Sequence, residues 1–332
     1  MKLSKVVVSL CVWLASAASL PAQYAFKTVQ YPGSTVSAAF GINDAGEVVG
    51  TWVGGEASSS GFLYLNGHYQ AMIVDYGITP ISLFDVSDFG FLVGTSGKSQ
   101  LSGFSMSAPL TSSNQENVSI DTQLNYPGAF ETRVTGINPL GTIEVGYYIT
   151  SSGEEFGFKS VISQRAVVPF GPAGVQSTAQ GVNDKGDVVG VVAGTKGFSY
   201  GYLYTPAGGF QKIAFPGAVA TAAFGINDPG VIVGCYQGTN GPLDVNGFVL
   251  KAGVYTKVDV PGATETEVFG INANGVIAGF YTGPGGGNEK GFIGTPSTTA
   301  SVLLDPPDVS EPFVLPSADF LRMAKGRAFT GR

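Results

Sequence analysis

The chain has 332 residues, of which 44% are hydrophobic and 12% are charged, and it carries a net charge of -7. This length is sufficient for a large buried core. The 17 basic and 24 acidic side chains form no basic stripe that could neutralise phosphates, which argues against nucleic acid as a partner.

The first stretch, residues 1–22, reads as a secretory signal peptide. It carries Lys2 and Lys5, then an apolar run from Val6 to Leu14, then small residues. Cleavage fits after Ala22 or Ala18, and we favour Ala22. The apolar run is too short to span a bilayer, so we expect no membrane span and a secreted, extracellular or cell-surface protein.

Removal of Lys2 and Lys5 with this segment would change the net charge from -7 to -9. Cys235 would then be the one remaining cysteine, because Cys11 lies in the signal segment. A lone cysteine cannot form an internal disulfide, so stability after export must come from burial and sheet hydrogen bonding.

A ten-residue motif, GINDAGEVVG at Gly41–Gly50, organises the chain that follows. It returns in three clear copies and two divergent ones: Gly181–Gly190, Gly225–Gly234 and Gly270–Gly279, then Asp85–Gly94 and Gly136–Gly146. Self-similarity at a nearly fixed interval predicts a repeat architecture.

The third residue of each copy serves as a mark, and successive marks lie 44, 51, 45, 44 and 45 residues apart. The marks are Asn43, Ser87, Asn138, Asn183, Asn227 and Asn272. Three residues after each mark stands a glycine: Gly46, Gly90, Gly141, Gly186, Gly230 and Gly275. We interpret each Asn-Asp-x-Gly as a tight hairpin whose glycine needs positive φ. Alternating carboxylates and a closing Glu, which a calcium loop needs, are missing, so we predict no metal site and no cofactor.

Four short strands follow from the pattern of each repeat. The first leads into the mark, as in Ala38–Ile42, and the second follows the turn, as in Val48–Gly50. The third begins with glycine and an aromatic residue, as at Gly61, and the fourth usually ends in Pro-Gly, as in Phe210–Gly217. Residues 23–294 are therefore predicted to form an all-β, six-bladed β-propeller of four-stranded antiparallel blades.

The phase of the repeat predicts how the ring closes. The chain enters on a strand of the fourth type, Phe26–Gly33, and the last repeat ends on its third strand at Phe292–Ile293. The N-terminal strand should therefore complete the last blade; an open stack is the alternative. Residues 295–332 read as a linker and a short tail, with Ser317–Gly326 a candidate helix.

The repeated motif, its Gly-Phe step and a strand ending in Pro-Gly-Ala resemble the bacterial extracellular HAF repeat family. The resemblance covers about residues 24–294 and implies a secreted protein of β-propeller type. It brings no catalytic residues. The family often has His just before the Gly-Phe step, where this chain has Ser60, Ser102, Phe156, Tyr200, Asn246 and Lys290.

Four repeats place a large aromatic residue two positions after the second-strand glycine: Trp52, Tyr148, Tyr236 and Tyr281. These side chains are expected where the strand enters the loop between the second and third strands. They are candidates for binding sugar rings by stacking. Packing between blades is the simpler interpretation.

Paired charges before the mark are the candidates for general acid–base chemistry: Glu131 and Arg133 in the third repeat, and Glu265 and Glu267 in the sixth. Residues two apart on a strand share a face, and these repeats would stand opposite each other in a six-membered ring. Solvated strand ends are the alternative. His68, the single histidine, is expected in a surface turn, where it has no partners for zinc.

The sequence thus favours a secreted, monomeric propeller that acts as a binding or interaction module for a glycan or an extracellular protein, and contains no clear catalytic motif. The alternatives are a secreted carbohydrate-active hydrolase or lyase, with carboxylates at the channel mouth, and a structural cell-surface or matrix protein.

Overall fold

The computed structural model describes residues 23–54, 57–73, 80–97, 100–107, 115–117, 120, 122–164, 166–193, 199–241, 243–284 and 287–297. The predicted signal peptide and the predicted C-terminal helix lie outside these residues. Apart from one 3-10 turn, η2 (Ile162–Gln164), every regular element among them is a strand.

The described strands pair in six antiparallel groups of four, here called sheets 1 to 6. Sheet 1 contains β2 (Val36–Ile42), β3 (Val48–Gly54), β4 (Ala57–Leu65) and β5 (His68–Ile73). Sheet 2 contains β6 (Ile81–Val86), β7 (Phe91–Ser96), β8 (Ser102–Ser107) and β10 (Thr122–Leu124). Sheet 3 contains β11 (Glu131–Ile137), β12 (Ile143–Ile149), β13 (Glu155–Val161) and β14 (Ala166–Pro169).

Sheets 4 to 6 follow in the same order along the chain. Sheet 4 contains β15 (Ser177–Val182), β16 (Val188–Ala193), β17 (Ser199–Thr205) and β18 (Gly209–Ile213). Sheet 5 contains β19 (Ala220–Ile226), β20 (Ile232–Gln237), β21 (Val245–Lys251) and β22 (Val254–Val258). Sheet 6 contains β23 (Glu265–Ile271), β24 (Ile277–Thr282), β25 (Glu289–Ser297) and β1 (Gln23–Val29). Single parallel pairs link sheet 3 to sheet 4 and sheet 5 to sheet 6.

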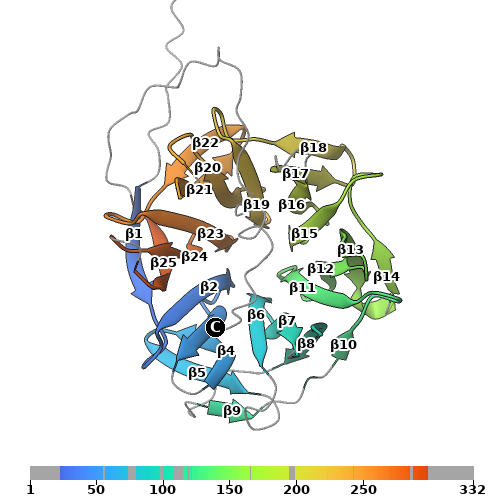
Figure 1. Cartoon of the computed structure of the whole chain (residues 1–332), viewed down its shortest axis with the longest axis horizontal. Helices are drawn as coiled ribbons and strands as arrows, with labels where there is room; N and C mark the ends of the chain where they lie inside the picture. The colour runs from blue at the N-terminus through green and yellow to red at the C-terminus, as the bar shows by residue number, and fades with distance from the viewer. Residues whose placement is uncertain are drawn as a thin grey trace, which may run out of the picture.

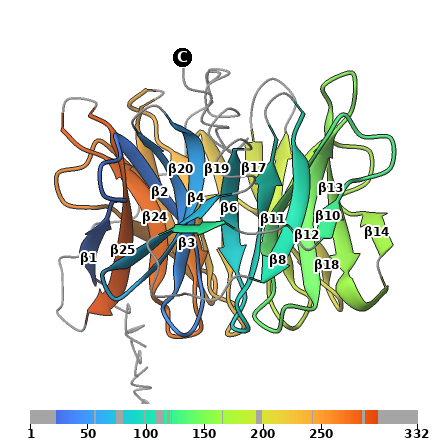
Figure 2. The ribbon, with the colours of Figure 1, turned by 90° about the horizontal axis from the view of Figure 1, so that it is seen from below.

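The sheets stand around a central axis, as Figure 1 shows in a view along it. The first strand of each repeat lies nearest the axis, and we call β2, β6, β11, β15, β19 and β23 the inner strands. Figure 2 shows the side view, in which the strands run between two faces. The face that carries the Asn-Asp-x-Gly turns is called the turn face, and the opposite face the loop face.

The N-terminal strand joins the last repeat, as the phase of the repeat predicts. Strand β1 pairs with β25 along its whole length, from Gln23 opposite Ser297 to Val29 opposite Gly291. Strand β25 thus continues three residues beyond the predicted end of the repeats at residue 294.

Sheet 1 has a fifth strand that the repeat pattern does not predict. Strand β9 (Gln115–Asn117), which belongs to the longest repeat interval, pairs in parallel with β5. His68 also differs from its expectation, because Asn66 and Gly67 form the turn with positive φ and half-buried His68 is the first residue of β5.

The turn prediction is confirmed in all six repeats. The glycine three residues after each mark has positive φ, between 66° at Gly141 and 83° at Gly230. A side chain at such a position costs about 1–2 kcal/mol, which glycine avoids.

The Gly-aromatic pattern explains the interior of each sheet. The second-strand glycine lies beneath the aromatic ring of the third strand, and a Cβ at Gly234 would meet the carbonyl oxygen of Ala222 at 2.0 Å and the Phe248 ring at 2.9 Å. The third-strand rings are almost completely buried: Phe62, Phe104, Phe158, Tyr202, Phe248 and Phe292.

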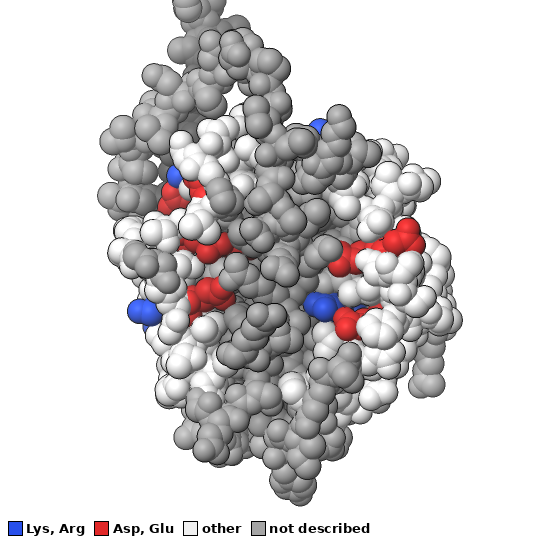
Figure 3. All heavy atoms as spheres, viewed as in Figure 1, with Lys and Arg blue, Asp and Glu red and all other residues white. Residues whose placement is uncertain are grey.

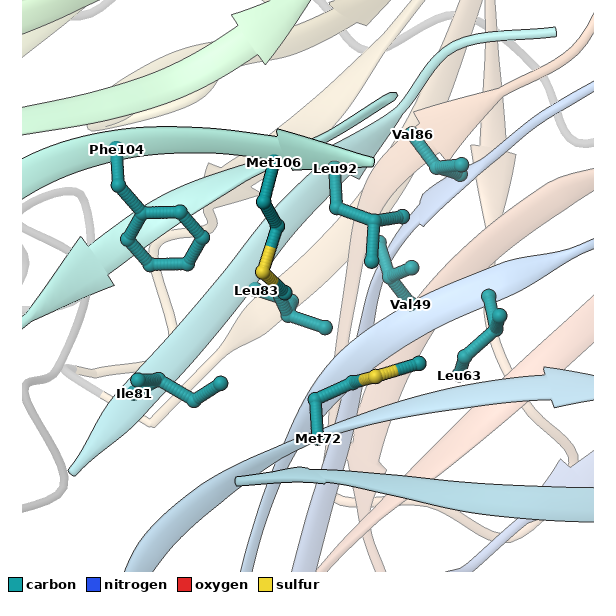
Figure 4. Packing of buried hydrophobic residues seen from close by; sticks show 9 residues of the cluster. All are labelled: Val49, Leu63, Met72, Ile81, Leu83, Val86, Leu92, Phe104 and Met106. Atoms are coloured by element: carbon teal, nitrogen blue, oxygen red, sulfur yellow. The ribbon is translucent and has the colours of Figure 1, made fainter. Parts of the chain in front are cut away.

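Neighbouring sheets share their hydrophobic cores. The first such cluster combines Val49, Leu63 and Met72 of sheet 1 with side chains of sheet 2, as Figure 4 shows. The sheet 2 members are Ile81, Leu83, Val86, Leu92, Phe104 and Met106. Because each sheet packs its faces on its neighbours, the sheets hold one another at a fixed distance from the axis.

Candidate functional site

The inner strands approach one another closely because each carries a glycine two residues before the mark, except in repeat 2. A Cβ on Gly225 would lie 2.4 Å from the carbonyl oxygen of Phe269, and one on Gly270 would lie 2.6 Å from that of Phe40. At this level the backbones of neighbouring sheets therefore pack almost directly against each other.

A ring of side-chain hydrogen bonds joins consecutive sheets at the turn face. The Nδ2 atom of Asn43 donates to Ser87 O, that of Asn183 to Asn227 O, and that of Asn227 to Asn272 O. The Nδ2 atom of Asn272 donates to Asn43 O at 3.1 Å, across 229 positions in the sequence.

The aspartates that follow the marks strengthen this ring. Asp44 accepts a bond from the Ala273 N–H, Asp88 from the Asp44 N–H, and Asp228 from the Asp184 N–H. Asp184 Oδ1 accepts both the Leu140 N–H and the Asn138 amide. The Asn-Asp motif therefore acts between sheets as well as within its own turn.

Repeat 2 departs from the motif at two positions, with Asp85 for the glycine and Ser87 for the asparagine. The carboxylate of Asp85 accepts the Val86 N–H at 2.9 Å and the Ile137 N–H of sheet 3 at 3.0 Å. Asp85 thus links sheets 2 and 3, where the asparagine amide is missing.

Asp85 lines a cavity on the axis. The centre of a water-sized molecule can move through about 90 Å³ of it, so several waters or a small organic molecule fit. The cavity reaches the turn face between Asp44, Asp88 and Asp228, of which Asp44 and Asp88 are exposed.

The electrostatics of the cavity are acidic. Removal from bulk water raises the pKa of Asp85 to about 7. Its two backbone hydrogen bonds lower this pKa, and the nearby Asp88 raises it. Burial, followed by the neighbouring aspartates, likewise raises the pKa of Asp88. Among the residues that line the cavity there is no Lys, Arg or His.

Aromatic rings form part of the cavity wall. Phe40 contacts Phe84 and Phe269 edge to face, with ring centroids 5.5 and 5.1 Å apart, and Phe224 stacks on Phe269 at 4.4 Å. The same position of repeats 3 and 4 holds Thr135 and Gln180, so that side of the wall is polar.

The four aromatic residues predicted to bind a ligand lie further from the axis, and three of them stack on a ring just before a Pro-Gly turn. Trp52 stacks on Tyr31 at 4.3 Å, Tyr148 on Tyr126 at 3.7 Å, and Tyr236 on Phe215 at 3.7 Å. The hydroxyl of half-buried Tyr281 lies 3.0 Å from Thr28 Oγ1. These contacts agree with the packing interpretation, and ligand binding by these residues stays a prediction.

The first predicted charge pair, Glu131 and Arg133, forms an ion pair of 3.1 Å on inner strand β11. The Arg133 guanidinium also lies over the Tyr147 ring, 5.7 Å from its centroid. Burial lowers the pKa of Arg133, but Tyr147, Glu131 and Glu155 outweigh it and raise that pKa above its usual value.

The second predicted pair, Glu265 and Glu267, lies on inner strand β23. Glu265 accepts a hydrogen bond from Thr282 Oγ1 at 3.0 Å. Glu267 is buried, and the Cys235 thiol approaches its carboxylate to 3.8 Å. Burial, and then these two carboxylates, raise the pKa of Cys235 well above its usual value.

Figure 3 shows charged atoms on two sides of the centre of the loop face. In the described part of the chain, no three His, Cys, Asp or Glu side chains are grouped as they would be around a metal ion. No helix of that part is long and apolar enough to cross a membrane.

Comparison with solved structures identifies the fold. A protein assigned as TolB from Agrobacterium tumefaciens superposes with a TM-score of 0.52 and 10% identity, over 84% of this chain and all of that one. A protein of unknown function from Dyadobacter fermentans gives 0.50 and 13%, over 82% of this chain and 99% of that one.

TolB from Acinetobacter baumannii gives 0.49 and 12% over 81% of this chain, which spans only 65% of the TolB length. No family model matches the chain, and neither does any curated protein. The superposition on the protein assigned as TolB and the four-stranded antiparallel sheets around one axis show that this all-β chain has a β-propeller fold. At such identities the similarity concerns the fold alone.

Proposed function

We propose that the chain is an exported six-bladed β-propeller with HAF-type repeats, closed by its N-terminal strand, and that it acts as a binding module without catalysis. The pairing of β1 with β25 supports closure, as does the Asn272 hydrogen bond to Asn43. The proposed export rests on the signal-like residues 1–22, and we expect a monomer that binds neither nucleic acid nor membranes.

The observation that carries the proposal is the axial cavity. Its walls come from all six inner strands, and it ends on a deeply placed carboxylate, Asp85, at a position where the other five repeats have glycine. A concave site that combines apolar walls with converging polar groups is the usual form of a small-molecule site. The ligand is therefore proposed to enter from the turn face.

Sugar binding by Trp52, Tyr148, Tyr236 and Tyr281 is the second candidate, at the loop face. Stacking on Tyr31, Tyr126 and Phe215 already occupies one ring face of three of these residues. The enzymatic alternative has less support, because Glu131 is held in an ion pair with Arg133 and Glu267 is buried beside Cys235.

A thermal-shift screen with small metabolites and oligosaccharides tests the site, using two variants. Gln180→Phe fills the cavity with the residue that four other repeats have at this position, at the loss of one hydrogen bond to Thr178. Trp52→Ala/Tyr281→Ala instead removes two of the loop-face rings.

Ligands that stabilise the wild type and the double variant but not Gln180→Phe would support binding in the axial cavity. Ligands lost only in the double variant would move the site to the loop face. If no ligand loses its stabilising effect in Gln180→Phe, the proposed site is refuted.

A further inference from the structure

We propose that the axial cavity binds a small organic ammonium ion, with Asp85 as its counter-ion and the phenylalanine rings as its walls. This inference rests on the proposed function and specifies the ligand class for the same site. It combines three features of the cavity: its charge, its aromatic surface and the placement of one carboxylate.

The charge of the cavity selects a cation. Asp44, Asp85, Asp88 and Asp228 line the cavity, and no basic side chain lines it. Arg133, on inner strand β11, does not line the cavity and is paired with Glu131 at 3.1 Å. A cavity with acidic groups only attracts cations and repels anions, more strongly where solvent does not screen the charges.

The walls select an organic cation over a metal ion. Metal ions of the magnesium and calcium type need several oxygen ligands, whereas Asp85 is the one cavity-lining carboxylate on an inner strand, and no three His, Cys, Asp or Glu side chains of the described residues are grouped around a common point. Phe40, Phe84, Phe224 and Phe269 line the cavity and contact one another in pairs. Aromatic faces attract weakly hydrated organic cations such as quaternary ammonium groups.

The position of Asp85 makes it the anchor. It lies deep on the axis but is only partly covered, because part of its surface faces the cavity. Its two backbone hydrogen bonds fix the orientation of the carboxylate and use one acceptor site on each oxygen. A carboxylate oxygen can accept a second bond, so the group can still bind a cation.

The test compares choline with 3,3-dimethylbutan-1-ol, a neutral molecule of the same shape, by titration calorimetry on the exported protein at about pH 8, where Asp85 is mostly ionised. Nα-acetyl-lysine methylamide is a third probe and tells whether a protein side chain can supply the ammonium group. We expect choline to bind in about the millimolar range and the alcohol at least about tenfold more weakly.

Two variants separate charge from structure. Asp85→Asn keeps an oxygen acceptor but removes the charge, and Asp85→Gly restores the residue of the other repeats. Both should reduce choline affinity by about tenfold or more, since a charge-assisted contact is lost. Glu154→Gln, which removes the same charge from an exposed residue that does not line the cavity, should change affinity by less than about threefold.

The affinity for choline should fall as the pH is lowered below about 7, because Asp85 becomes neutral. The groups around it are Asp44, Asp88 and Asp228 at the mouth, Tyr147 in the wall, and the Arg133–Glu131 pair behind Tyr147. Glu154→Gln retains Asp85 and should keep this pH dependence, whereas Asp85→Asn should lose it.

Equal binding of choline and the alcohol would overturn the inference, as would unchanged binding in Asp85→Asn or the absence of binding by both choline and the lysine probe at about 10 mM. In each case the Gln180→Phe screen still decides whether the cavity binds another class of ligand. If the lysine probe bound and choline did not, the site would be restricted to primary ammonium groups, and the counter-ion role of Asp85 would be supported.

Discussion

Replacing Asn183 tests whether the ring of side-chain hydrogen bonds stabilises the propeller. This residue is fully buried, and its Nδ2 donates to Asn227 O of the next sheet and to Asp187 Oδ2. Its Oδ1 accepts the N–H groups of Lys185 and Asp187 within its own turn. One side chain therefore serves both the turn and the contact between sheets.

Two substitutions separate these roles. Asn183→Ser should keep an acceptor for the turn, because Ser87 accepts the Phe91 N–H in repeat 2 at 3.0 Å. It loses the bond to sheet 5, and we expect a loss of about 1 kcal/mol in the free energy of unfolding. Asn183→Ala also leaves the partly buried N–H groups of Lys185 and Asp187 without this acceptor and should cost about 2–3 kcal/mol.

Urea unfolding followed by far-ultraviolet circular dichroism measures both losses, with m-values compared to confirm a common unfolding reaction. Asn274→Ala, at an exposed turn position, is the matched control and should stay within about 0.5 kcal/mol of the wild type. The reasoning fails if Asn183→Ala is as stable as this control, or if Asn183→Ser and Asn183→Ala are equally destabilised.

Three further predictions concern packing and pH. Gly234→Ala, whose Cβ would lie 2.0 Å from Ala222 O, should lose about 3 kcal/mol or more, whereas Gly283→Ala has open space and should change little in a thermal melt. A double-mutant cycle of Phe215→Ala and Tyr236→Ala should give a coupling energy of about 0.5–1.5 kcal/mol; a value near zero would contradict the packing role of this stacked pair. Because the folded pKa of Asp85 lies near 7 and its unfolded pKa near 3.8, its contribution to stability is present below about pH 4 and is lost as the pH rises through 7. The stability of the wild type relative to Asp85→Asn should therefore fall by up to about 4 kcal/mol between about pH 4 and 8, and a pH-independent difference would refute the assigned pKa.

Much of the fold could be predicted because the sequence repeats. A position that holds glycine in six copies, such as Gly46 and its equivalents, indicates a backbone requirement, and the positive φ values confirm it. The N-terminal strand was placed by the phase of the repeat alone, and the pairing of Val29 with Gly291 agrees with that placement.

Features that occur once were harder to predict. Strand β9 lies in the one long repeat interval, where no second copy shows its partner. The role of Asn43 between sheets depends on an acceptor in another repeat, whereas the local motif reveals only the turn.

The candidate site was missed for the same reason. Asp85 is visible as a departure from glycine when the six copies are aligned, but a single divergent copy does not show that its carboxylate lines a cavity. The predicted charge pairs do lie on inner strands, yet Arg133 and Glu131 satisfy each other, which a single strand pattern cannot show.

The pairing of β1 with β25 also has a consequence for biosynthesis. The first strand of the domain to leave the ribosome has its hydrogen-bonding partner at residues 291–297, near the end of the repeats. Until that partner is made, the backbone of β1 has no strand beside it and its edge can pair with another chain. If the chain is exported as proposed, translocation before folding would bring both strands into the same compartment before they have to pair.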